Sequence, residues 1–141
     1  MDPRRHPLAE APYVSLTTFR RTGAPVSTPV WIAPAVDGTE HLVFVSVDDT
    51  GKTKRLAHTR RVELRPCDVR GQVADGAPMY RGEAEVVRDD AGVRAVRAAL
   101  AAKYGWQARL LSAANAAAGL TGVGRKPRAA IVIEVEHLPA A

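Results

Sequence analysis

The sequence predicts a mainly β domain in which about six antiparallel strands form a small barrel with helical additions. Three observations support this fold class. Short runs rich in β-branched and aromatic residues show strand-like alternation, short turns join most of these runs, and helical periodicity comes late in the chain. The length of 141 residues is enough for one domain with a substantial core, and we assign residues 1–141 to it. Strands are expected at residues 13–19, 25–33, 41–47, 62–69, 79–88 and 129–137.

The first half of the chain is expected to form a hairpin. Residues 1–11 are polar and proline-rich, and we expect a loose arm or a short helical lead-in there. Residues 13–19 alternate between apolar and polar side chains like a strand, and residues 25–33 form the antiparallel second strand after a turn that contains Gly23. Pro29 lies inside the returning run. Because proline cannot donate to a ladder, this strand must be kinked, bulged or at an edge there, and bulges recur beside active sites.

The helical signals follow the fifth strand. Asp89 and Asp90 supply an N-cap for a helix that runs to Lys103. An alanine-rich helix is expected at residues 106–120, followed by a glycine-rich basic loop at residues 119–127. The apolar residues of the first helix form one stripe that is expected to pack on the core: Val93, Val96, Leu100 and Tyr104. In the last strand, one face is predicted to carry Ile131, Ile133 and Val135, and the other Val132, Glu134 and Glu136.

The end of the third expected strand predicts an anion site. The strand breaks at residues 48–51, and Lys52, Lys54 and Arg55 follow in the first turn of a short helix. Free backbone N–H groups and the helix dipole favour an anion at a helix start, whereas cations there oppose the dipole unless an anion is bound. We therefore interpret Gly51 to Arg55 as a phosphate or carboxylate site. The alternative is a solvated basic turn. A P-loop is excluded, because that motif needs a glycine where this chain has Ser46.

Composition narrows the classes of function. The net charge of +5 comes from cations spread along the chain, and the few aromatic residues do not interleave with them, so small anionic molecules are favoured over nucleic acid. With a single cysteine, Cys67, no internal disulfide forms, and a cytoplasmic protein is expected. No signal peptide or membrane span is expected. The four histidines are scattered, so no metal site is predicted.

Several motifs in order resemble one superfamily. They are Tyr13-Val14-Ser15-Leu16-Thr17-Thr18, Gly23-Ala24-Pro25-Val26, Thr28-Pro29-Val30-Trp31 and Gly51-Lys52-Thr53-Lys54-Arg55-Leu56. Together they resemble the split-barrel flavin- and deazaflavin-binding superfamily that includes pyridoxamine 5'-phosphate oxidase. With Cys67-Asp68-Val69-Arg70-Gly71 they are most similar to its branch of coenzyme F420-dependent oxidoreductases. The resemblance covers about residues 12–137.

The resemblance implies a homodimer of six-stranded antiparallel split β-barrels, with a cofactor site at each side of the subunit interface. By similarity, Lys52 would hold the cofactor phosphate, supported by Ser46, Thr50 and Arg55. The tricyclic ring would lie against the second strand, beside Thr28, Pro29, Val30 and Trp31. Arg70 and Gly71 would reach the cofactor or substrate from the partner subunit.

The implied activity is transfer of a hydride between the deazaflavin and a small unsaturated or quinone-like substrate. Because the cofactor carries this chemistry, no catalytic side chain is assigned. FMN, as in pyridoxamine 5'-phosphate oxidase, is the alternative cofactor, although Lys54, Arg55, Arg60 and Arg61 suit the longer anionic tail of the deazaflavin better. A non-catalytic flavin, deazaflavin or haem carrier stays open, as does a nucleic-acid-binding barrel.

Two residues in these motifs also have an ordinary structural interpretation. Trp31 is either part of the ring wall or a core residue. Cys67 is interpreted as a small buried hydrophobe rather than a nucleophile, because no histidine neighbours it in sequence.

Overall fold

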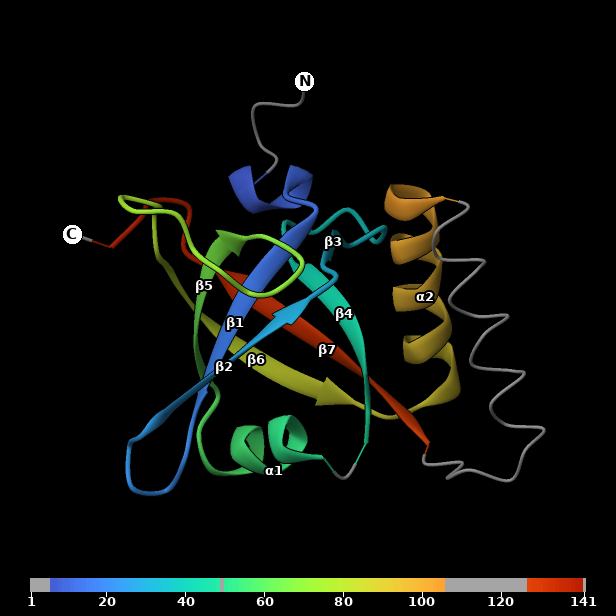
Figure 1. Cartoon of the computed structure of the whole chain (residues 1–141). Coiled ribbons are helices and arrows are strands. Elements are labelled where there is room, and N and C mark those ends of the chain that lie inside the picture. The colour runs from blue at the N-terminus through green and yellow to red at the C-terminus, as the bar shows by residue number, and fades with distance from the viewer. Residues whose placement is uncertain (1–5, 49, 106–126, 141) are drawn as a thin grey trace.

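The structure is a computed structural model that describes residues 6–48, 50–105 and 127–140. Within these residues, seven strands form one antiparallel sheet in the order β2-β1-β5-β6-β7-β4-β3 (Figure 1). Two α-helices and a 3₁₀ turn complete the described chain. The elements are η1 Pro7–Glu10, β1 Tyr13–Phe19, β2 Pro25–Val30, β3 Ala33–Pro34, β4 Leu42–Val47, α1 Gly51–His58, β5 Arg61–Cys67, β6 Tyr80–Val87, α2 Asp90–Tyr104 and β7 Arg128–Val135.

The sheet is curled, because its two edge strands are consecutive in the chain. Only Trp31 and Ile32 separate β2 from β3, yet these strands lie at opposite ends of the strand order. The sheet edges therefore meet at this corner, which confirms the predicted antiparallel split barrel. The prediction of six strands was wrong by one, because the corner divides the run at residues 25–33 into β2 and β3. Pro29 pairs with Ser15 in the edge strand β2, so the edge position predicted for it as one option is confirmed.

Alternation along the strands builds the core inside the curl. In β7, Ile131 and Ile133 are fully buried while Glu134 is exposed, which confirms the predicted faces of this strand. Phe44 is the largest fully buried side chain of this interior. The same cluster takes residues from most of the strands, including Val14, Leu16, Leu42, Val62 and Leu64.

Helix α2 covers the outer side of β4 and β7 and stands at the right flank of the barrel in Figure 1. The Asp89 carboxylate caps it by accepting the Gly92 N–H at 2.9 Å. Val93, Val96 and Leu100 of its predicted apolar stripe pack on the strands in a second buried cluster, whereas Tyr104 is not part of that cluster. The helix and most of the loop expected at residues 106–126 lie outside the described residues. No helix among the described residues is long and apolar enough to cross a membrane.

The N-terminal segment forms a short helical lead-in, the 3₁₀ turn η1, which is the second of the two options predicted for residues 1–11. Leu8 and Ala9 are buried in the barrel core. His6 caps the 3₁₀ turn: its Nδ1 accepts the Leu8 N–H at 3.1 Å, so its Nε2 carries the proton and donates to the Glu136 carbonyl at 2.8 Å. The imidazole thus fastens η1 to the end of β7.

The pKa of His6 lies below its usual value because burial disfavours the imidazolium, and the charge of nearby His137 acts in the same direction. The Glu136 carbonyl and Glu40 oppose this shift, and the ring of Tyr80 faces the imidazole edge-on. Neutral His6 therefore contributes its full stabilisation of the folded chain above the unfolded histidine pKa of about 6.5. This contribution is lost as the pH falls through the lower pKa that His6 has in the folded chain.

We expect the free energy of unfolding, measured by denaturant titration between pH 7 and 5, to fall more steeply in the wild type than in His6→Asn. Asparagine keeps a capping acceptor near the position of Nδ1 and does not titrate. Parallel pH profiles for the two proteins would contradict the role of His6.

Candidate cofactor site at the start of helix α1

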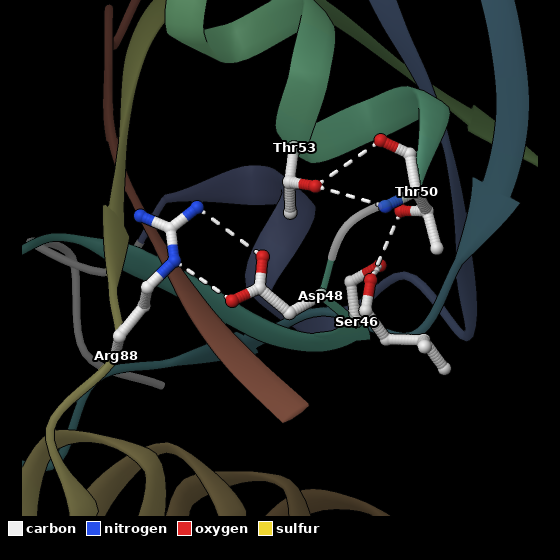
Figure 2. A network of polar contacts seen from close by, with 6 residues as sticks. Ser46, Asp48, Thr50, Thr53 and Arg88 are labelled. Atoms are coloured by element: carbon white, nitrogen blue, oxygen red, sulfur yellow. Dashed lines mark hydrogen bonds and ion pairs between the residues drawn. The ribbon is translucent and has the colours of Figure 1, made fainter. Parts of the chain in front are cut away.

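The turn between β4 and α1 is fixed by its own hydroxyl groups (Figure 2). The Thr50 hydroxyl donates to the Val47 carbonyl at 2.9 Å, and the Thr50 N–H donates to the Thr53 hydroxyl oxygen at 3.0 Å. The Thr53 hydroxyl in turn donates to the Thr50 carbonyl at 3.1 Å. Thr50 therefore orders the turn with the hydroxyl that was predicted to help hold a phosphate. Ser46 lies nearby, with its hydroxyl 3.4 Å from the Val47 carbonyl.

An ion pair ties this turn to the end of β6. Two nitrogens of the Arg88 guanidinium donate to the Asp48 carboxylate at 2.7 and 3.2 Å (Figure 2). The Asp48 N–H also donates to the Pro127 carbonyl at 2.8 Å. Neither Thr53 nor Arg88 was predicted as a site residue. The spacing of Thr50 and Thr53 resembles a capping box, but nothing in the local sequence points to Arg88, which is 40 residues away.

The cations of the turn repel one another. Lys52 is half-buried, and burial together with the nearby charge of Arg55 lowers its pKa. Burial also lowers the pKa of Arg55, as does the charge of Arg20 at the end of β1. Arg55 is held in place from β1, because its Nε donates to the Thr18 hydroxyl at 2.5 Å. Its guanidinium lies beside Gly51, where an added Cβ would sit 2.5 Å from Nη1.

This arrangement fits a bound anion. Cations at the positive end of a helix raise the electrostatic energy of the folded chain, and a phosphate or carboxylate would reverse that cost. Of the predicted residues, the structure brings Gly51, Lys52 and the Arg55 guanidinium together and leaves Lys54 exposed on the helix. The predicted first-turn position of Arg55 is wrong, because this residue lies in the last turn of the short helix and its guanidinium reaches back to Gly51. The structure adds Thr18 and Arg20, which the sequence pattern missed because they lie more than thirty residues earlier (the Thr18–Arg55 pair is separated by 37).

The residues predicted to line the cofactor ring do not share one face. Along β2, Thr28 and the buried Val30 point toward the barrel interior, whereas Pro29 is exposed on the opposite side. Trp31 leaves the strand and stacks on Tyr104, with ring centroids 4.4 Å apart. Since β2 is an edge strand, its backbone has one side without a partner strand among the described residues. A ring wall at residues 28–31 stays a prediction, and the strand edge is the part of β2 best placed to provide it.

The loop that carries Arg70 lies against β2 of its own chain. The Asp68 carboxylate accepts the N–H groups of Arg70 and Gln72, which orders the loop as a tight turn. Gly71 has a φ of 84°, and a Cβ there would meet the Pro29 ring at 3.3 Å. The resemblance implied that this loop acts from the partner subunit. Within one chain, the structure already brings it to the outer face of β2.

The described residues include other features that lie outside this turn. Burial raises the pKa of Cys67, which disfavours its reactive thiolate. No group of three His, Cys, Asp or Glu side chains within the described residues could hold a metal ion. Two open hollows, of about 670 and 500 Å³, lie on the outer face of β5–β7 and beside the end of α2, away from the start of α1. Neither hollow is lined by Lys52, Arg55 or residues 28–31. We therefore place the candidate site by the charge of the turn and by the edge of β2.

Comparisons with known structures support the fold. The structure of an F420 reductase is similar at 21% identity and a TM-score of 0.56, covering 96% of each chain. The conserved hypothetical protein Rv2991 of Mycobacterium tuberculosis shares 17% identity at a TM-score of 0.61, covering 92% of this chain and 76% of that one. HutZ, the haem storage protein of Vibrio cholerae, shares 14% identity at a TM-score of 0.60, covering 90% and 83%. No curated protein matches the chain.

The family assignment comes from a comparison of the sequence with known protein families. The model of the pyridoxamine 5'-phosphate oxidase family matches residues 4–139, nearly the whole chain. Its members bind flavin-type cofactors and include oxidoreductases. With the curled antiparallel sheet and the cationic turn after β4, the chain belongs to the pyridoxamine 5'-phosphate oxidase family.

Proposed function

We propose that the protein is an oxidoreductase that binds coenzyme F420 and passes a hydride between the deazaflavin and a small unsaturated or quinone-like substrate. The observation that carries the proposal is the cluster of Lys52, Arg55 and Arg20 beside the start of α1, in a chain of a flavin-binding family. In this proposal the protein acts as a cytoplasmic homodimer, with the site at the subunit interface.

The residues of the chain would bind and orient the cofactor. Lys52 would contact the phosphate, and Arg55, held by Thr18, would add a second cation. The edge of β2 would offer backbone groups to the ring, and the Arg70 loop would border the substrate. The bound cofactor supplies the hydride chemistry, so the protein needs no catalytic acid or base of its own.

The choice between F420 and FMN rests on where the surplus cations lie. Of the cations first assigned to the longer tail of F420, Arg60 lies 4.0 Å from Glu85, and the Arg61 guanidinium stacks 3.9 Å over the ring of Phe19. Arg20 replaces Arg60 and Arg61 as the additional cation near the site, because its charge acts directly on Arg55. A cation beyond the phosphate contact favours a ligand with more than one anionic group. FMN remains the second candidate, since a single phosphate would satisfy Lys52.

Replacing Lys52 by alanine should weaken cofactor binding about tenfold to a hundredfold, because a charge-assisted hydrogen bond is worth roughly 1.5–3 kcal/mol. The dissociation constant is measured by cofactor fluorescence. Arg97→Ala is the matched control, since it removes one exposed cation from α2, away from the site. Lys52→Arg should retain most of the affinity. An unchanged affinity in Lys52→Ala would refute the phosphate assignment.

A parallel titration of the purified protein with F420 and with FMN tests the cofactor. We expect micromolar or tighter binding of F420 and weaker binding of FMN. Reduced F420 should then be oxidised on addition of a quinone or an activated alkene, which is followed by absorbance. Tighter binding of FMN would overturn the choice of cofactor, and tight F420 binding without turnover of any acceptor would indicate a carrier instead of an enzyme.

A further inference from the structure

The corner between the two sheet edges is held by side chains from the end of α2. The Ile32 N–H donates to the Tyr104 hydroxyl oxygen at 3.1 Å, and the Ile32 carbonyl accepts from Lys103 Nζ at 2.5 Å. The Tyr104 hydroxyl also lies 3.1 Å from the Ile32 carbonyl. Both backbone polar groups of Ile32 are thus bonded to a helix 71 and 72 residues further along the chain, in place of a neighbouring strand.

The same two side chains reach the segment before β1. Lys103 Nζ donates to the Ala11 carbonyl at 2.6 Å, and the Tyr104 hydroxyl can donate to the Pro12 carbonyl at 2.9 Å. Burial raises the pKa of Tyr104 to about 12, so the hydroxyl keeps its proton at neutral pH and can serve as donor and acceptor together. The end of α2 therefore joins the start of β1 to the end of β2.

Tyr104 also sets the orientation of Trp31. The two rings are stacked with centroids 4.4 Å apart and planes inclined by only 10°. Lys103 Nζ lies 4.9 Å from the centroid of the Tyr104 ring, where a cation interacts favourably with the aromatic face. Trp31 is only half-buried, so this stack orients an aromatic ring that is still partly accessible.

We propose that Tyr104 and Lys103 are positioning residues for the cofactor ring, which act by fixing the Trp31–Ile32 corner and with it the exposed edge of β2. This inference rests on the proposed function. The strand edge can give a ring well-placed backbone partners only if its end is held, and among the described residues β1 pairs with it on one side alone. The hydrogen bonds from α2 provide the missing restraint at the end of the strand.

The experiment compares Tyr104→Phe and Lys103→Met with the control Arg97→Met, which removes an exposed charge from the same helix. Phenylalanine keeps the stack on Trp31 and removes only the hydroxyl. We expect both corner variants to weaken binding of the whole cofactor, F420 or FMN, about tenfold, as for the loss of a well-made hydrogen bond. Binding of inorganic phosphate near Lys52, followed by NMR shifts, should stay the same. Amide exchange at Ile32 should accelerate, and Arg97→Met should match the wild type.

Two results would overturn the inference while the proposed function stands. One is wild-type cofactor affinity in both corner variants, and the other is an equal loss of cofactor and phosphate binding, which would mark a general structural role. Failure of the wild-type protein to bind either cofactor is a different outcome. It would overturn the proposed function, and the positioning role would fall with it.

Discussion

One constraint shapes this molecule: the two edges of a single curled sheet meet at two residues, Trp31 and Ile32. Because β2 and β3 are consecutive in the chain but terminal in the sheet, the barrel closes at this corner by a chain connection and not by a full ladder. The short β3 pairs with only two residues of β4. Among the described residues, most of β2 is thus left with one unpaired edge, and such an edge is available to a partner strand or a ligand.

The cationic turn between β4 and α1 is a separate element that is stabilised by contacts of its own. Hydroxyl groups of Thr50 and Thr53 and the Arg88–Asp48 ion pair fix its backbone. Lys52 therefore lies at an ordered helix start, and the Arg55 guanidinium reaches back to it from the last turn. Burial lowers the pKa of Lys52 and of Arg55, and the charge of a neighbouring cation (Arg55 for Lys52, Arg20 for Arg55) acts in the same direction. Such an arrangement opposes folding unless an anion is bound, which is why it indicates a binding function more strongly than the count of cations does.

The parts of the fold that could be predicted from the sequence are those with local causes. Alternation located the strands and the buried face of β7, and the Asp89 cap with its apolar stripe located α2. What escaped prediction depends on distant partners. His6 orders the N-terminal segment through a carbonyl 130 residues away, and Tyr104, expected only as a core residue, bonds the corner from 72 residues away. No sequence periodicity encodes such pairs. The cationic turn could therefore be predicted, but the contacts of Thr18 and Arg20 with Arg55 and the bonding of the Trp31–Ile32 corner could not.

The alternation of β2 also decides which residues matter for a planar ligand. Since Thr28 and Val30 face one side and Pro29 the other, no flat ring can contact all of these side chains at once. A ring against β2 must depend mainly on the backbone of its free edge, and backbone groups are placed by whatever holds the strand. The fold by itself does not select the ligand, because a haem storage protein has a similar barrel at a TM-score of 0.60. In the proposed function, selectivity comes from outside the strand: the cations of α1 would recognise the anionic part of the cofactor, and the end of α2 would set the geometry that the ring meets.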